Sequence, residues 1–317
     1  MKQQVFEDQH AEQWRQLEAM LASPEDMLTA DFPARYRAVC QHLSVAKGRR
    51  YTPYLINYLN RLVVEGHRLL YRHHNNLRRS LLWFLVAGFP SVVRSNRSYV
   101  FIAAALFLLP LLVMGIGCYS NSELIYSVAD SASVHSYESM YNPESPVLGR
   151  ERGSGTDVAM FGFYIYNNIG IGFRTFAAGI FFGLGSIFFL VFNGLSIGSI
   201  AGYLTQLGYI ETFYGFVSGH AAFELTAIVL CGAAGLKLGF SLVAPGPHSR
   251  ADAIRMAGRE AVLIVYGAAL MLVVAAFIEA FWSSSRELPL LLKYGVGALM
   301  GLLLGAYLLF AGRRVGT

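Results

Sequence analysis

The sequence predicts an all-α protein, a polytopic helical membrane bundle preceded by a cytoplasmic helical region. The first observation is composition: 55% of the 317 residues are apolar and only 14% are charged, whereas about 25% of residues in a soluble domain are charged. The second is distribution: residues 1–98 contain 14 of the 25 Lys and Arg and 8 of the 20 Asp and Glu. Residues 99–317 therefore carry too few charges to solvate a globular surface. This excludes a purely soluble enzyme and a secreted disulfide-bonded scaffold.

Residues 1–80 are expected to form a cytoplasmic bundle of about three helices. Apolar residues such as Phe6 and Trp14 recur near helical spacing in the first. The second is expected to begin near Asp31 and the third near Pro53. The region contains no apolar run typical of a cleaved signal peptide. The pattern leaves open whether the bundle packs only on itself or also presents a face to a partner.

Residues 81–98 are expected to form an interfacial elbow helix. The apolar run between Arg79 and Pro90 is roughly 10 residues long, whereas a membrane span needs about 20. We therefore expect this segment to lie in the cytoplasmic interface, with Trp83 at the depth of the lipid headgroups.

Residues 99–317 are expected to form the membrane domain, with five long apolar spans. The spans are Tyr99–Cys118, Thr175–Tyr203, Phe213–Val243, Ala261–Trp282 and Leu288–Phe310. A polar extracytoplasmic loop is expected at 119–156. A shorter apolar segment at 158–173 is interrupted by Asn167 and Asn168.

The distribution of basic residues predicts the sides of the membrane. The N-terminal region, the connection at 244–259 and the tail with Arg313 and Arg314 are basic, as cytoplasmic segments usually are. Placing all three on the cytoplasmic side requires an even number of crossings. The short segment at 158–173 then makes the sixth crossing. Five crossings, with that segment on the outer surface, stay open as the alternative.

Glycines recur every fourth residue in two of the expected spans. The three sets are Gly179 and Gly183; Gly194, Gly198 and Gly202; and Gly297, Gly301 and Gly305. Small residues at this spacing let two helix backbones approach closely. The spacing predicts helix packing within one chain, or a contact between two copies for one set, most easily the last.

Four polar residues are predicted to form a centre inside the membrane domain. His220 and Glu224 are four residues apart and therefore share a helix face. Glu279 lies near the end of the next long span, and antiparallel packing of the two spans brings it to a similar depth. We expect these three side chains to converge in one polar pocket. Asn193 is expected to hydrogen-bond across helices.

Polar residues at membrane depth admit three interpretations. The first is a mutually satisfied structural cluster, and the second is a proton or ion pathway. The third is a metal-dependent or acid–base hydrolytic site, since His220, Glu224 and Glu279 offer one imidazole and two carboxylates to a metal. Asn167 and Asn168 are further candidates for the centre. No catalytic residue and no cofactor is predicted.

The spaced motifs resemble those of the stage II sporulation protein M family over residues 80–310. The residues that carry the resemblance are Asn167-Asn168, Gly179, Gly183, Asn193-Gly194, Gly198, Gly219-His220, Glu224-Leu225, the run Gly232 to Leu236, and Ile278-Glu279-Ala280. Residues 1–80 resemble the cytoplasmic helical extension of members from non-sporulating bacteria.

The resemblance implies a multi-pass protein of the bacterial inner membrane with a cytoplasmic N-terminus. It also implies a scaffold that recruits or organises cell-envelope proteins, such as peptidoglycan-degrading enzymes in sporulating bacteria or a MoxR-type ATPase system elsewhere. Membrane lipid is an expected partner, a homo-oligomer is an option, and nucleic acid is not expected. A transporter, channel or lipid-moving protein and an intramembrane hydrolase stay open as alternatives to the scaffold.

Overall fold

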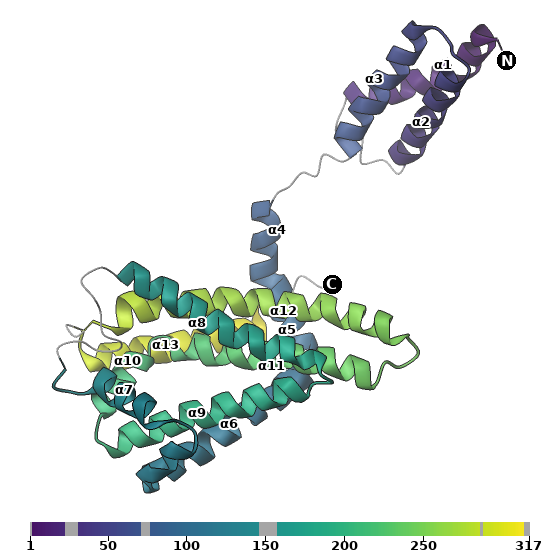
Figure 1. The fold of residues 1–317 in the computed structure, drawn as a ribbon. Helices are drawn as coiled ribbons and strands as arrows, with labels where there is room; N and C mark the ends of the chain where they lie inside the picture. The colour runs from purple at the N-terminus through teal and green to yellow at the C-terminus, as the bar shows by residue number, and fades with distance from the viewer. Residues whose placement is uncertain (1, 23–30, 71–76, 146–156, 286–287, 314–317) are drawn as a thin grey trace. The chain divides into compact units, whose positions relative to one another are not determined.

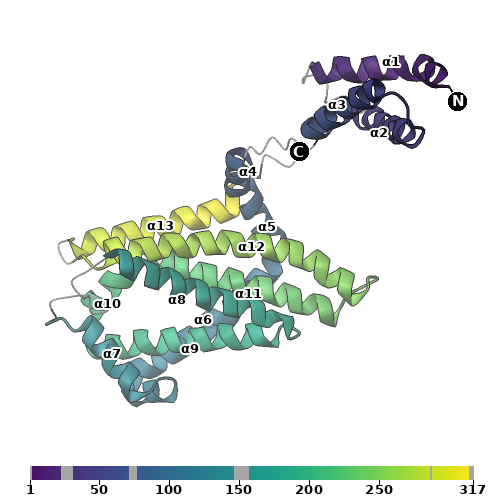
Figure 2. The ribbon, with the colours of Figure 1, turned by 45° about the horizontal axis from the view of Figure 1, so that its top comes forward.

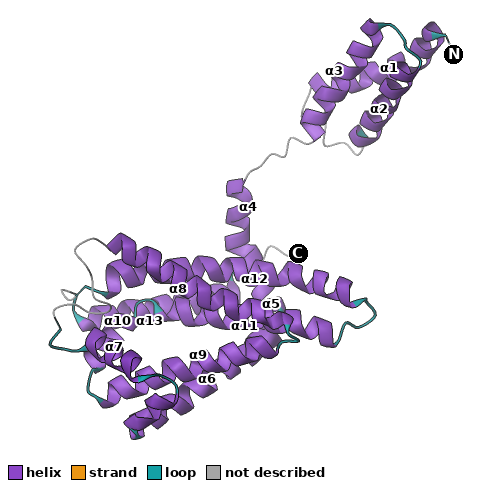
Figure 3. Cartoon of the chain, viewed as in Figure 1, coloured by secondary structure: helices purple, strands orange, loops and turns teal. Residues whose placement is uncertain are grey.

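The computed structural model describes residues 2–22, 31–70, 77–145, 157–285 and 288–313. All regular secondary structure in these ranges is helical (Figures 1 and 3). The chain divides into two compact units, Met1–Ser80 and Leu81–Thr317. The described part contains five helices that are long and apolar enough to cross a membrane. The prediction of an all-α, multi-pass membrane fold is confirmed.

The N-terminal unit contains α1 (Gln3–Ala22), α2 (Phe32–Gly48) and α3 (Pro53–Leu70). One apolar face of each helix contributes to a shared core, which includes Phe6, Trp14, Leu17, Val39, Leu59 and Leu62. Pro53 occupies the first turn of α3, where its missing N–H leaves no hydrogen bond unmade. This unit therefore has a hydrophobic core of its own.

The second unit begins with a bent helical segment. It consists of α4 (Leu77–Trp83, which includes the boundary between the units), the π-helix η2 (Phe84–Gly88) and α5 (Phe89–Ser95). Trp83 is exposed, but Phe89 of α5 is buried among residues of α11, α12 and α13. Only the first half of the expected interfacial elbow therefore has an exposed apolar surface, because α5 packs into the bundle.

In the described part of the membrane bundle, six helices run along its length. They are α6 (Arg97–Ser120), α8 (Asp157–Ala177), α9 (Leu184–Gln206), α11 (Ala221–Val243), α12 (Arg250–Ile278) with the π-helix η5 (Glu279–Ser283), and α13 (Leu290–Phe310). Figure 2 shows α8, α11 and α12 side by side, with α6 and α9 forming a pair. A Cβ on Gly172 of α8 would touch Cys231 of α11, and one on Gly179 would overlap Gly235, so these two helices run in the same direction.

Two of the expected spans are wrong because each contains a turn. Thr175–Tyr203 is divided between α8 and α9 by the short 3₁₀-helix η4 (Ala178–Ile180) and a reversal in which Gly183 has a φ of 84°. Phe213–Val243 is divided between α10 (Ile210–Val217) and α11. The first turn contains the apolar residues Phe181 and Phe182. The second, at Ser218, Gly219 and His220, is only three residues long within an apolar stretch, so neither turn lowers the hydropathy enough to mark a break.

Four other expected segments differ from the structure. The segment at 158–173 is part of the 21-residue α8, long enough at about 1.5 Å per residue to extend roughly 30 Å. The last two spans begin at Arg250 and Leu290. The region expected as a loop at 119–156 contains the 3₁₀-helix η3 (Ser122–Ser127) and α7 (Ser131–Tyr141), and its residues 146–156 lie outside the described part.

The glycine sets pack mainly within the chain. Added Cβ atoms on Gly194, Gly198 and Gly202 would overlap backbone carbonyl groups of α6. On α13, a Cβ on Gly297 would overlap the Ser218 carbonyl oxygen, whereas Gly305 has open space around it. The set on α9 therefore lets α6 and α9 approach closely.

Candidate polar centre in the membrane bundle

The candidate site lies where α11 begins beside the end of α12. His220 occupies the break between α10 and α11 and is 4% exposed. Gly219, just before it, lies against η5: a Cβ there would be 3.2 Å from a methyl group of Ile278 and 3.1 Å from the Trp282 ring. Glycine at this position lets the break pack closely on η5, which brings His220 to the residues of η5.

His220, Glu224 and Glu279 lie together in this region. One potential ligand atom from each residue can be chosen so that all three lie within 4.8 Å of one another. The Nε2 atom of His220 is 3.8 Å from a carboxylate oxygen of Glu224, whose side chain is 20% exposed. This separation exceeds the usual hydrogen-bond length. The structure therefore has the convergent arrangement expected of the three residues, while their role stays a prediction.

The π-helix η5 supplies a second contact to the histidine. Ser283 is fully buried, and its Oγ atom lies 2.9 Å from Nδ1 of His220. Because Nδ1 is occupied by this hydrogen bond, Nε2 is the ring atom that faces Glu224. Glu279 and Ser283 are four residues apart, at the two ends of η5. Single π-helical turns inside α-helices are frequent at functional sites.

Lys293 at the start of α13 completes the surroundings of η5. It is 2% exposed, and its Nζ atom donates hydrogen bonds to the carbonyl oxygens of Ser283 (3.0 Å) and Ser285 (2.6 Å). These two bonds satisfy carbonyl groups where the helix ends. Neither Lys293 nor Ser283 was predicted to belong to the centre. A lysine inside an apolar run was a signal for the first, but no sequence pattern pointed to the second.

The asparagines have different surroundings. Asn168 of α8 is 2% exposed, it accepts a hydrogen bond from Asn167 (3.1 Å), and its own amide nitrogen has no partner among the described residues. It lies one turn from Tyr164, which packs against Ala280 of η5. Asn168 thus belongs to the helix face that approaches the centre.

Asn193 of α9 makes a hydrogen bond of a different kind from the one expected. Its amide donates to the carbonyl oxygen of Phe189 in the same helix (2.6 Å). Its neighbour Gly194 packs against the backbone of α6. The described hydrogen bonds do not link Asn193 to His220, Glu224 or Glu279.

A second polar cluster lies at the other end of α11. The Nζ atom of Lys237 is 2.5 Å from a carboxylate oxygen of Glu260 and 2.6 Å from the Asn96 side-chain oxygen. The Asn96 amide donates to the same Glu260 oxygen at 3.0 Å. This cluster joins α11, α12 and the start of α6. Lys237 was not predicted to belong to a polar cluster.

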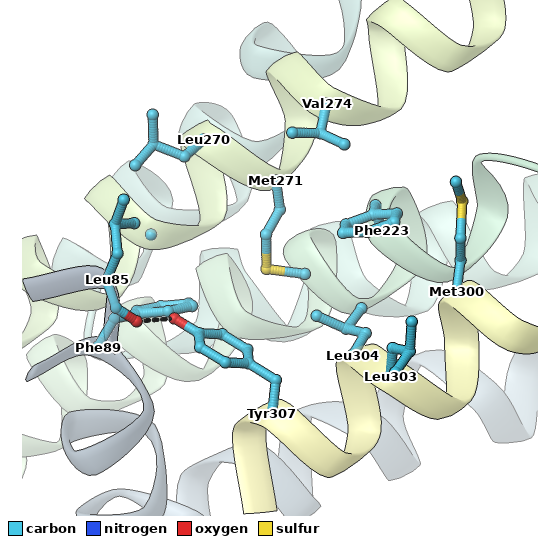
Figure 4. Close-up of a pocket in the computed structure, with 11 residues that line it drawn as sticks. Leu85, Phe89, Phe223, Leu270, Met271, Val274, Met300, Leu303, Leu304 and Tyr307 are labelled. Carbon is cyan, nitrogen blue, oxygen red and sulfur yellow. Dashed lines mark hydrogen bonds between the residues drawn. The ribbon is translucent and has the colours of Figure 1, made fainter. Parts of the chain in front are cut away.

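An apolar cavity of about 330 Å³ lies among the bent helical segment (η2 and α5), α11, α12 and α13 (Figure 4). Phe223, Met271 and Leu303 line it, and the Tyr307 hydroxyl donates a hydrogen bond to the Leu85 carbonyl oxygen at one end. This bond satisfies a carbonyl group of the bent helical segment. The apolar lining suits a hydrocarbon chain rather than a polar ligand.

The polar centre has donor atoms for two kinds of chemistry. One imidazole nitrogen and two carboxylate oxygens can coordinate a divalent cation. Two neighbouring carboxyl groups can also share one proton. The first use requires His220 to keep Nε2 directed at the carboxylates, and the Ser283 contact holds it so.

Two family models match the chain. The model described as Stage II sporulation protein M matches residues 99–284, which is more than half of the chain and includes His220, Glu224, Glu279 and Ser283. A model described as a domain of unknown function (DUF8413) matches residues 4–72, within the N-terminal unit. Searches of the curated proteins and of the solved structures found no match.

Proposed function

The chain belongs to the stage II sporulation protein M family, and from this premise we propose that it is a scaffold of the bacterial cytoplasmic membrane that organises cell-envelope proteins. The N-terminal unit is proposed to be cytoplasmic and to bind a soluble partner, for which a MoxR-type ATPase is the first candidate. The membrane bundle is proposed to hold this unit at the bilayer and to contact envelope proteins.

The observation that carries this proposal is the division into two compact units. Met1–Ser80 has a hydrophobic core of its own, separate from the cores of the helical membrane unit. A module of this kind folds around its own core, and its surface is left available for binding. Among its exposed side chains, Tyr54 on the first turn of α3 is 85% exposed. Tyrosine is enriched at the centres of protein interfaces.

Photocrosslinking in living cells tests the scaffold. A photoreactive amino acid is placed in the full-length chain at Glu12, Arg37 or Tyr54, exposed positions on each of the three N-terminal helices. We expect a discrete protein adduct from at least one of them. Leu302 on α13 is the matched control, because it is 73% exposed on an apolar helix and should face lipid.

The identity of the adduct decides the result. A MoxR-type ATPase or another envelope-associated protein recovered at an N-terminal position, and not at Leu302, supports the scaffold. Repeated absence of any protein adduct at all three N-terminal positions contradicts it.

One observation favours a second candidate, a path for protons or ions. His220, Glu224 and Glu279 lie together in the membrane bundle, and the buried amide of Asn168 lies on the neighbouring helix face. Chains of such residues form proton relays in transporters. Proton flux in proteoliposomes tests this candidate, and equal flux for the parent and a His220→Ala, Glu224→Ala double variant would contradict it.

A further inference from the structure

We propose that His220, Glu224 and Glu279 bind one divalent transition-metal ion, with Zn²⁺ as the ion to test. The proposal goes beyond the scaffold and does not depend on it. Potential ligand atoms of the three residues can be chosen within 4.8 Å of one another, and the residues come from the α10–α11 break, the first turn of α11 and η5. Their closeness therefore depends on how α11 and η5 pack together.

The donor set suits such an ion. Zinc binds imidazole nitrogen and carboxylate oxygen at about 2.0–2.2 Å, so neighbouring ligands around a tetrahedral ion lie roughly 3.3 Å apart. Nε2 of His220 and the nearer Glu224 oxygen are 3.8 Å apart, which is close to this separation. They are also too far apart to hydrogen-bond each other directly. A small side-chain rotation would let both atoms contact an ion between them.

The histidine is already oriented as a ligand. Metal-binding histidines usually form a hydrogen bond through the other ring nitrogen, which fixes the ring and its tautomer. Here Nδ1 lies 2.9 Å from Oγ of Ser283. The backbone of Ser283 is held in turn by Lys293, which donates to its carbonyl oxygen. Nε2 is therefore the proposed ligand atom, and Ser283 is a positioning residue.

Access and charge are also consistent with an exchangeable ion. His220 is buried, but Glu224 and Glu279 are partly exposed, so an ion can reach the site from the surface of the bundle. Three protein ligands would leave a fourth position for water. A dication would also compensate the charge of two carboxylates in an apolar environment.

Zinc titration of the purified chain tests the proposal. The full-length protein is prepared in detergent with a tag that contains no histidine, stripped of metal with a chelator, and titrated with Zn²⁺ alone in competition with a fluorescent chelator. We expect one Zn²⁺ per chain. We expect Glu224→Gln and His220→Asn to lose this stoichiometric binding, and Ser283→Ala to weaken it by about 10- to 100-fold.

A carboxylate elsewhere on α12 supplies the matched control. Glu260→Gln should leave zinc affinity unchanged, because Glu260 belongs to the cluster with Lys237 and Asn96. Size-exclusion elution in detergent establishes which variants keep the fold. As a second measurement, Zn²⁺ should raise the thermal midpoint of the parent and not that of Glu224→Gln.

Two outcomes would overturn the proposal. The first is a folded parent protein that binds no zinc in the competition assay, which would leave a proton shared by the two carboxyl groups as the account of the site. The second is equal zinc binding by the parent, Glu224→Gln and His220→Asn, which would place the ion elsewhere.

Discussion

The two ends of α11 carry polar clusters of different kinds. Near its C-terminal end, Lys237, Glu260 and Asn96 contact one another at 2.5–3.0 Å, so that each makes two direct contacts. At its N-terminal end, His220 and Glu224 lie 3.8 Å apart. The first cluster has the geometry of a completed structural contact among three helices. The second retains space between its donor atoms, and space of this kind is what a bound ion or proton requires.

The largest expected effect comes from Lys293, the buried lysine that contacts η5. Lys293→Met should destabilise the bundle by about 3 kcal/mol, because it removes the charged hydrogen bonds to one buried and one partly buried carbonyl group. The measurement is thermal unfolding in detergent. Unfolding unchanged from the parent would mean that the carbonyl oxygens of Ser283 and Ser285 find other partners.

The Lys237 cluster should be more sensitive to substitution than the His220–Glu224 pair. Lys237→Met should lower the free energy of unfolding by about 2 kcal/mol, since it removes the partner of both Glu260 and the buried Asn96. The loss stays below that of a fully buried ion pair because the Glu260 side chain is half-exposed. Adding Glu260→Gln should cost little more, because the two residues act together. Additive losses in a double-mutant cycle would contradict this coupling.

At Glu224, loss of the polar group should destabilise the protein more than loss of the charge alone. In metal-free protein, Glu224→Gln should keep the fold and change unfolding by less than about 0.5 kcal/mol, because the carboxylate makes no close hydrogen bond to His220. Glu224→Leu should lower the free energy of unfolding by about 1 kcal/mol, because it leaves Nε2 of the buried histidine facing an apolar group. The yield of folded protein should fall with it. Size-exclusion yield in detergent distinguishes them, and equal yields would contradict the contrast.

The smallest expected effect concerns a histidine pair in the N-terminal unit. The rings of His10 and His42 stack at 4.0 Å, and Trp14 donates a hydrogen bond to Nδ1 of His42. Burial, and to a lesser extent His10, hold the pKa of His42 below its ordinary value of 6.5. His42 therefore binds a proton more readily in the unfolded chain than in the folded one. The stability gained from keeping His42 neutral is lost as the pH falls through about 6.5.

Hydrogen exchange of the full-length chain checks this expectation. Protection of α1 and α2 should fall several-fold between pH 7 and pH 5, after correction for intrinsic exchange. His42→Phe should reduce the difference, and α11 serves as the internal reference. An unchanged pH dependence in His42→Phe would assign the effect to another group.

Much of the architecture could be predicted from composition and spacing, and the exceptions have physical causes. Low charge and long apolar runs identify a helical membrane bundle, but a turn made of Phe181, Phe182 and Gly183 has the hydropathy of a span. The spacing of His220 and Glu224 predicts a shared face, and the order of the helices predicts the depth of Glu279. The contact of Ser283 with His220 depends on how η5 packs, which local sequence does not encode. Lys293 was missed because it was counted as part of an apolar run.

The π-helical turn at Glu279–Ser283 makes the centre depend on chain length as well as on residue type. Such a turn holds one residue more than the α-helical turn it replaces. Deleting Ala280, a small buried residue of this turn, would let the turn wind as an α-helix and would leave Ser283 close to its present direction from α12. Deleting one residue from the α-helical part of α12 would instead rotate every later residue by about 100° relative to the start of the helix. Ser283 would then leave the histidine although neither partner had been substituted. Whether a deletion alters the centre therefore depends on its place in the helix, even when none of the ligands changes.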